Sequence, residues 1–149
     1  MDLKELAISN IDKAHDRYRK DIESLTHEQL DQHHGGARSA YDFTYEVANV
    51  NNRVAMRVRG EDPGAPSDGW TVAPDDFKSK EACTAGLAES VANLKSALEA
   101  CADFTEVRDL PLGKMSIFEL ANFMLVHMTY HDGQLNFIQA MADDQEVHW

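Results

Sequence analysis

Two histidines near the end of the chain, His127 and His131, stand four positions apart in the segment FMLVHMTYHDGQL. Residues at this spacing lie one above the other on a helix, so both imidazoles can face one point. A divalent metal ion would bind both rings and satisfy nitrogens that a helical core otherwise leaves without partners. Helical histidine pairs also occur at the edges of cores, with one nitrogen in water. The spacing alone is compatible with either arrangement.

The residue after His127 is Met128, so this segment is not the HExxH motif of zinc proteases. That motif supplies its general base from the same helix. A further ligand or base must therefore come from another part of the chain. The remaining histidines show no metal-ligand spacing and are expected to be solvated or in loops: His15, His27, His33, His34 and His148.

The histidine pair lies on the last of four predicted helices. All four prolines and six of the eight glycines fall in three short regions that separate helix-friendly segments. Between these breaks apolar residues recur at spacings of three and four, the pattern of helices with one buried face. The predicted helices cover about residues 2–22, 39–59, 75–101 and 117–141.

The helix starts and the connections define the expected architecture. Ser39 with Asp42, and Ser116 with Glu119, have the spacing of capping boxes. Residues 25–38 are predicted to be a loop, residues 60–74 a long surface loop and residues 107–113 a short extended piece. Four helices joined in this way predict an all-α, antiparallel four-helix bundle, with the long loop between helices 2 and 3 and a single domain over residues 1–149.

Trp70, in the long loop, is expected to fold back onto this bundle.

Composition restricts the classes of partner. The 149 residues include 26 acidic and 14 basic side chains, a formal charge of -12, and the basic residues form no cluster. Nucleic-acid binding needs a cationic surface, and a membrane helix needs about 20 consecutive apolar residues. The N-terminal segment also lacks the pattern of a secretory signal. We therefore expect a cytoplasmic protein that binds neither nucleic acid nor membranes, with Cys83 and Cys101 as free thiols.

Several of these segments together resemble a known family. The pattern H-x-x-x-H-x-G-Q, from His127 to Gln134, the segment Ser39–Arg59 and the turn LPLGK are similar to the DinB-like family of small bacterial four-helix proteins. The similarity spans essentially the whole chain. It implies one divalent metal ion, which members of the family typically hold with three histidines, two from the last helix and one from the second.

The second predicted helix departs from that pattern because it contains no histidine, and Glu46 occupies the matching position. Glu46 lies along the apolar stripe of its helix, where burying an unpaired carboxylate would be costly. With His127 and His131 it would form a set of two histidines and one carboxylate. Such a set suits zinc or nickel first, with iron or manganese as alternatives. In the competing interpretation Glu46 points partly to solvent and pairs with Arg53 or with an imidazolium.

Four further residues are expected beside the metal ligands or in a pocket: Asn49, Arg53, Tyr130 and Gln134. Gln134 could hydrogen-bond a ligand side chain, whereas the phase of Tyr130 also fits the core. Gly133 lies inside a helix, where glycine costs about 1 kcal/mol relative to alanine, and this indicates close approach of a helix or a ligand. No catalytic residue is assigned.

Two functions are compatible with the predicted metal site and the family resemblance. The first is a metal-dependent hydrolase or thiol-dependent transferase or isomerase acting on an unidentified small molecule. The resemblance implies it, because some relatives use bacillithiol-like or mycothiol-like cosubstrates. The thiol would come from the ligand, since neither Cys83 nor Cys101 is near the histidine pair in sequence. The alternative is a non-catalytic bundle or stress-response module with a structural or vestigial metal site. For both, the resemblance implies a homodimer.

Overall fold

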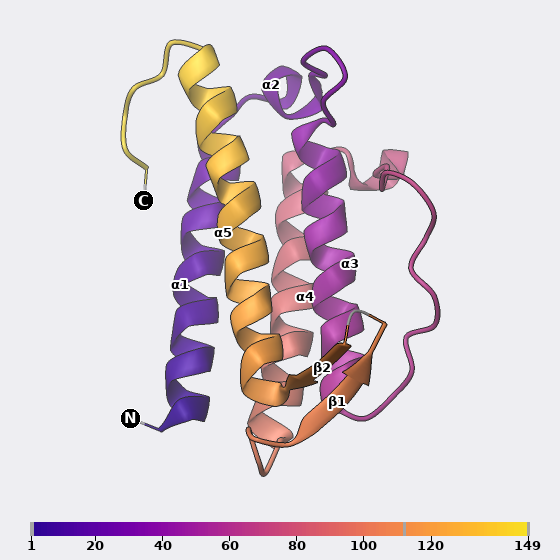
Figure 1. The fold of residues 1–149 in the computed structure, drawn as a ribbon. Coiled ribbons are helices and arrows are strands. Elements are labelled where there is room, and N and C mark those ends of the chain that lie inside the picture. Colours follow the sequence, from indigo (N-terminus) through magenta and orange to yellow (C-terminus); the bar gives the residue numbers. More distant parts are fainter. Residues whose placement is uncertain (1, 112, 149) are drawn as a thin grey trace.

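The computed structural model describes residues 2–111 and 113–148, and its main elements are long helices (Figure 1). These helices are α1 (Leu3–Ser24), α3 (Ala40–Val58), α4 (Lys80–Ala100) and α5 (Ile117–Met141). The shorter elements are α2 (His27–Asp31), the 3-10 helix η1 (Asp75–Phe77) and the antiparallel strands β1 (Val107–Leu110) and β2 (Gly113–Ser116). The predicted all-α four-helix bundle is confirmed. No helix within the described residues is long and apolar enough to cross a membrane.

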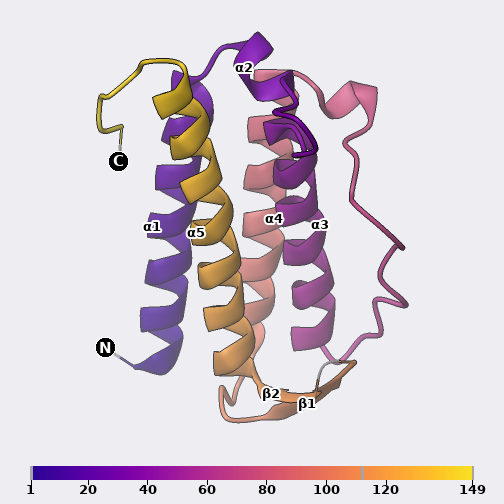
Figure 2. The same ribbon diagram turned by 45° about the horizontal axis from the view of Figure 1, so that its top comes forward.

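The four long helices surround one core and run two in each direction (Figures 1 and 2). Helix α3 packs against α4 and α5, and α1 packs against α4 and α5. The neighbours α3 and α4 run the same way, so the long loop after α3 must return the chain along the bundle before α4 begins (Figure 1). The packing of α3 on α5 brings the two helices of the candidate site together.

Both predicted capping boxes are confirmed. The Ser39 side chain accepts a hydrogen bond from the Asp42 backbone at 3.2 Å, and Asp42 accepts from the Ser39 backbone at 3.3 Å. Ser116 and Glu119 make the same exchange at the start of α5. These bonds satisfy backbone donors that have no partner within the helix. They fix where α3 and α5 begin, and hence which residues face the bundle interior.

The long loop is held near both ends. At one end Arg53 donates to the carbonyl oxygens of Pro63 and Gly64, at 3.0 and 2.7 Å. At the other, the buried Asp42 carboxylate accepts from the Ala73 backbone at 2.8 Å. The segment between these anchors carries Trp70. The loop is therefore attached to α3 twice, at the helix start and near its end.

Two predicted boundaries were wrong. Residues 25–38 are not only loop, because α2 forms after Thr26 and buries Leu30 completely. The third long helix does not begin at residue 75, because η1 comes first and Ser79 caps α4 instead. Both differences involve helices of five residues or fewer, which are too short to show an apolar period. A capping box of Thr26 and Gln29 starts α2, and the partly buried Phe77 of η1 packs against the core.

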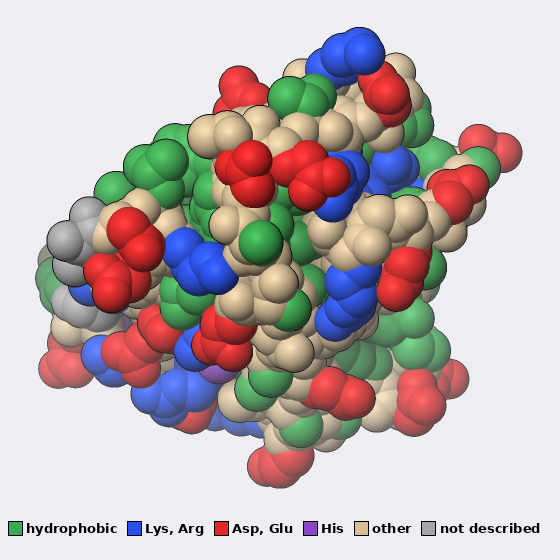
Figure 3. Space-filling view, turned by 90° about the horizontal axis from the view of Figure 1, so that it is seen from below, with side chains coloured by type: hydrophobic (Ala, Val, Ile, Leu, Met, Phe, Trp, Pro, Cys, Tyr) green, Lys and Arg blue, Asp and Glu red, His purple; other side chains and the backbone are tan. Residues whose placement is uncertain are grey.

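The extended piece before α5 is a two-stranded hairpin, in which Val107 pairs with Ser116 and Leu110 with Gly113. Leu112, in the LPLGK turn, lies outside the described residues. Figure 3 views the bundle from this end, where acidic, basic and apolar side chains alternate and no continuous basic patch appears on the described part of this face. The hairpin closes the end of the bundle opposite α2.

Trp70 lies against the bundle only at its surface. It is 76% exposed, and its ring lies 4.5 Å from the Arg38 guanidinium carbon. A guanidinium over an aromatic face is attracted by the ring quadrupole. The tryptophan is therefore held at the surface, over the start of α3.

Gly133 does not mark a close approach, because a Cβ atom added there would meet nothing within 4 Å. We expect Gly133→Ala to raise the free energy of unfolding by about 0.5–1 kcal/mol, since alanine loses less backbone entropy on helix formation. Urea unfolding followed by circular dichroism measures this change. Gly113→Ala is the control and should destabilise the fold, because Gly113 has a φ of 125°. A destabilised Gly133→Ala variant would contradict the prediction.

A carboxyl pair lies between α1 and α5, where Asp132 faces Asp21 and both are buried. Burial, and then the interaction with Asp21, raises the pKa of Asp132 to about 7. The folded state thus holds this proton more tightly than the unfolded chain. The stabilisation is complete below pH 4 and is lost as pH rises from about 4 to 7.

We expect Asp132→Asn to be more stable than the wild type at pH 8, by about 1–4 kcal/mol, because asparagine is neutral at every pH. Denaturant unfolding of chelator-treated protein at pH 5 and pH 8 measures the effect. Exposed Asp109→Asn serves as the control. Equal pH dependence in Asp132→Asn and the wild type would refute this assignment of the proton.

Candidate metal centre

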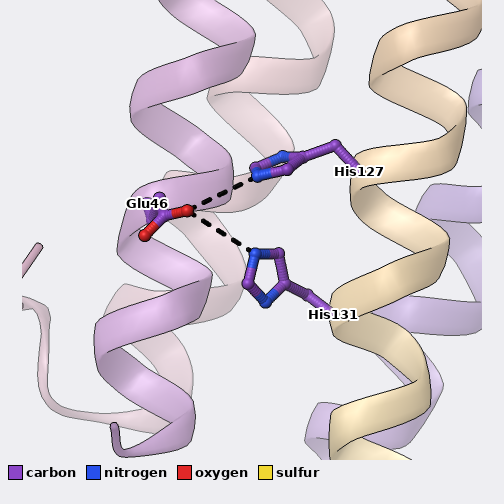
Figure 4. A group of neighbouring side chains, drawn as sticks. All are labelled: Glu46, His127 and His131. Atoms are coloured by element: carbon purple, nitrogen blue, oxygen red, sulfur yellow. Dashed lines mark ion pairs between the residues drawn. The ribbon is translucent and has the colours of Figure 1, made fainter. Parts of the chain in front are cut away.

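Three side chains from two helices meet between α3 and α5 (Figure 4). Glu46 extends from α3, and His127 and His131 extend from α5. Glu46 Oε1 lies 3.5 Å from His127 Nε2 and 3.7 Å from His131 Nε2. The atoms that these residues offer to a metal all lie within 4.8 Å of one another. The structure thus brings together the carboxylate and the two imidazoles that the sequence predicts as ligands.

The helices position these groups by their periodicity. Glu46 stands one turn after Asp42 of the capping box and next to the buried Val47. The side chain of Glu46 is 25% exposed. On α5, the four-residue spacing places the two imidazole centres 4.8 Å apart, with ring planes at 87°. The His131 side chain is 1% exposed and that of His127 is 15% exposed. The site therefore lies at the edge of the core, deepest at His131.

The orientation of His131 is fixed on two sides. Its Nδ1 lies 2.7 Å from Gln134 Oε1, and its ring stacks on Phe43 with centroids 5.2 Å apart. A side-chain carbonyl oxygen can only accept, so Nδ1 must carry the proton of this bond. In the neutral ring, Nε2 is then unprotonated, and its lone pair is directed towards Glu46. Gln134, expected beside the ligands, contacts one of them directly.

His127 stacks on Phe123, with ring centroids 5.8 Å apart, and its Nδ1 is buried without a hydrogen-bond partner among the described residues. Burial, reinforced by the charge of Arg38, lowers the pKa of His127. Burial likewise lowers the pKa of His131, to about 4. Both rings are consequently neutral near pH 7, the form in which imidazole binds metal ions.

The donor set fits a divalent cation. Two neutral imidazole nitrogens and one carboxylate oxygen converge, and their separations of 3.5 and 3.7 Å exceed the usual hydrogen-bond range. Ligand atoms at the corners of a tetrahedral zinc site lie about 3.3 Å apart, given bonds of about 2.0 Å. The two distances from Glu46 to the histidines are close to that value, and all three potential ligand atoms lie within 4.8 Å of one another. These three residues could therefore hold a metal ion with little movement.

Comparison with known proteins agrees with this architecture. A family model described as the DinB superfamily matches residues 10–135. The chain belongs to the DinB superfamily. Among solved structures it is similar to the crystal structure of a conserved protein of a locus from Enterococcus faecalis, with a TM-score of 0.73 and 16% identity over 93% of this chain and 96% of that one. At this identity the likeness shows the fold alone. No curated protein matches the chain.

The partner of Glu46 in this DinB-superfamily protein was not predicted. Arg38 Nη1 donates to Glu46 Oε2 in a short ion pair, whereas Arg53 binds the carbonyl oxygens of Pro63 and Gly64. The proposed Glu46–Arg53 pair is therefore wrong. Arg38 immediately precedes the Ser39 cap and so lies outside the helix, where no spacing rule relates it to Glu46. Its side chain is only 14% exposed, and it holds the second carboxylate oxygen while Oε1 faces the histidines.

The last two expected neighbours differ in their contacts. Tyr130 is 62% exposed, so its alternative placement in the core was wrong. Its ring meets His131 edge-on at 5.0 Å, and its hydroxyl accepts from Gln134 at 3.4 Å. Asn49 lines a cavity together with Glu46 and makes no hydrogen bond to the three candidate ligands within the described residues. Tyr130 and Gln134 therefore support the histidine side of the centre, and Asn49 only borders it.

Proposed function

We propose that this protein is a divalent-metal-dependent enzyme that acts on a small molecule, as a hydrolase or a thiol-dependent transferase. The observation that carries the proposal is the set Glu46, His127 and His131, whose potential ligand atoms converge within 4.8 Å. Within the described residues no fourth potential protein ligand joins this set. A metal ion held by three protein ligands keeps positions for exchangeable molecules, as catalytic zinc sites do.

A bound divalent ion would supply Lewis acidity, which makes water or a thiol a nucleophile near neutral pH. Zinc and nickel suit the two nitrogens and one oxygen best, with iron and manganese as alternatives. Arg38 keeps Glu46 oriented, and Gln134 keeps the His131 lone pair directed at the centre. The protein's own groups thus fix the ligand geometry before a substrate arrives.

The nucleophile would not be a cysteine of this chain. Cys83 is buried, and burial raises the pKa of its thiol to about 12. Cys101 ends α4 and donates its thiol to the Asp103 carbonyl oxygen, at 3.4 Å. A reactive thiol must therefore arrive with a cosubstrate. Both cysteines are free, which supports the proposed cytoplasmic location.

Cobalt(II) substitution tests the open position. Co²⁺ absorbs visible light with an intensity and wavelength that depend on its ligands. In the wild type we expect one bound Co²⁺ whose spectrum changes when azide or 2-mercaptoethanol is added, because either can occupy an exchangeable position. Glu46→Ala should show a weaker or altered spectrum, whereas exposed Glu23→Ala should match the wild type. A spectrum unchanged by both additives would overturn the catalytic proposal and favour a closed, structural site.

A dimeric helical module remains the second candidate, and one observation favours it. Exposed apolar side chains follow the outer face of α5: Phe123, Val126, Tyr130, Phe137 and Met141. Exposed apolar side chains gathered on one helix face are typical of a surface that another protein covers. The partner proposed here is a second copy of this chain.

If α5 forms the dimer interface, Val126→Asp should shift the protein from dimer to monomer, because a carboxylate would be buried at the contact. Sedimentation velocity at several protein concentrations measures the change. The control is Val72→Asp, on the exposed long loop, which should keep the wild-type state. A wild type that is monomeric throughout would exclude this partner.

A further inference from the structure

A cavity of about 310 Å³ lies against the histidine side of the metal centre, between the start of α3 and the second half of α5. We name it the aromatic pocket, after four of its lining residues: Phe43, Trp70, Tyr130 and Phe137. Arg38 and Gln134 also line it. Its volume is at the lower end of the range for small-molecule sites, which suits a molecule with one ring and a short head group.

The aromatic pocket adjoins the candidate ligands directly. Phe43 stacks on His131, Tyr130 meets the same ring edge-on, and Gln134 hydrogen-bonds to its Nδ1. Arg38, at the side of the pocket nearest α3, is paired with Glu46. A molecule in the pocket would therefore lie one side chain away from both the carboxylate and the buried histidine.

Arg38 gives the pocket its charge preference. No other lysine, arginine or acidic residue is among the described residues that line it. A guanidinium has five N–H donors, and Arg38 uses one nitrogen, Nη1, for Glu46. Its other nitrogens make no hydrogen bond within the described residues. A carboxylate could accept from them in a charge-assisted, bidentate arrangement.

From these contacts we infer that the aromatic pocket binds an aromatic carboxylate, with the ring among the aromatic side chains and the carboxylate on Arg38. Aromatic rings gain from offset or edge-to-face contacts beyond the apolar area they bury. The overall charge of -12 repels anions at long range, but salt near 0.15 M screens charges beyond about 8 Å. The adjacent Arg38 guanidinium therefore determines the electrostatic energy of a carboxylate bound in the pocket. The assignment of this ligand as substrate or cosubstrate rests on the proposed function; its binding does not require a metal.

Calorimetric titration of the 149-residue chain with phenylacetate tests this inference, in 0.15 M salt and both with chelator and with zinc. The neutral 2-phenylethanol and the non-aromatic cyclohexylacetate are the comparison probes. We expect phenylacetate to bind at least about tenfold tighter than 2-phenylethanol, the usual contribution of a hydrogen bond to a charged group. It should also bind about two- to tenfold tighter than cyclohexylacetate, the contribution of aromatic contacts.

Matched variants locate the site. Phe137→Ala should weaken phenylacetate binding about two- to tenfold, while Val147→Ala, at an exposed position beyond α5, should leave it unchanged. Arg38→Gln should remove the preference for phenylacetate over 2-phenylethanol, whereas Arg19→Gln, on α1 and outside the pocket, should retain it. Circular dichroism verifies that each variant is folded. Equal affinities for phenylacetate and 2-phenylethanol, or equal effects of Phe137→Ala and Val147→Ala, would overturn the inference.

The chelator arm separates this inference from the proposed function. Phenylacetate binding to chelator-treated protein with the expected preferences supports the pocket, even if zinc does not bind and the metal-dependent function fails. Zinc bound at one ion per chain without any preference for phenylacetate overturns the pocket and leaves the metal centre intact.

Discussion

Replacing His131 with alanine is expected to remove zinc almost completely from protein purified without an affinity tag, and His127→Ala should do the same. The wild type should hold close to one ion per chain. The two imidazoles supply two of the three converging ligands, and loss of one should weaken binding by at least about a hundredfold. Elemental mass spectrometry, normalised to protein concentration, measures the content of zinc, nickel, iron and manganese in one experiment.

The matched control is His148→Ala, because His148 lies beyond α5 and pairs with Asp144 at 3.0 Å. It should retain the wild-type metal content. His127→Ala is included because the His127 side chain is less deeply buried than that of His131, so its removal should disturb the fold less. Wild-type protein that remains metal-free after reconstitution with all four ions would remove the basis for the metalloenzyme.

Zinc is also expected to stabilise the fold strongly, because the ion would connect α3 to α5. At a free zinc concentration one thousand times the dissociation constant, the free energy of unfolding should rise by about 4 kcal/mol. For a chain of this size that corresponds to an increase in the melting temperature of about 8–16 °C. Thermal unfolding followed by circular dichroism, with zinc and then with excess chelator, measures the increase and its reversal.

Glu46→Ala should lose most of the zinc-dependent increase, since α3 would no longer supply a ligand. Glu23→Ala, which removes an exposed carboxylate on α1, should show the full increase. A wild-type melting temperature that is the same with saturating zinc and with chelator would contradict an ion bound between the helices. If Glu46→Ala were stabilised as much as the wild type, the ion would be bound without Glu46.

The sequence was sufficient to predict those parts of the fold that depend on local signals. Ser39 and Ser116 cap their helices as expected, because a capping box needs only residues three positions apart. The short helix α2 was missed although Thr26 and Gln29 form a capping box of the same spacing, because five residues are too few to show an apolar period. The complete burial of Leu30 packs this helix against the core. Likewise, β1 needs the pairing of Val107 with Ser116, a contact between two segments that are each too short to be recognised alone.

The same distinction applies to the site. The approach of His127 to His131 follows from helix periodicity, and the placement of Glu46 opposite them followed from its position on the apolar stripe and from the family resemblance. Arg38 could not be found in this way. It precedes its helix, and its approach to Glu46 depends on the path of the chain before Ser39, which no period describes.

The two anchors of the long loop have a consequence for how this protein could diversify. Arg53 and Asp42 fix the loop at Pro63, Gly64 and Ala73, so the chain between these points can change in length or sequence without moving α3. Loop closure entropy grows only slowly with length, and exposed loops tolerate insertions. Because Trp70 lies in this segment and lines the aromatic pocket, a library of altered loops could redirect ligand preference while the metal centre keeps its geometry.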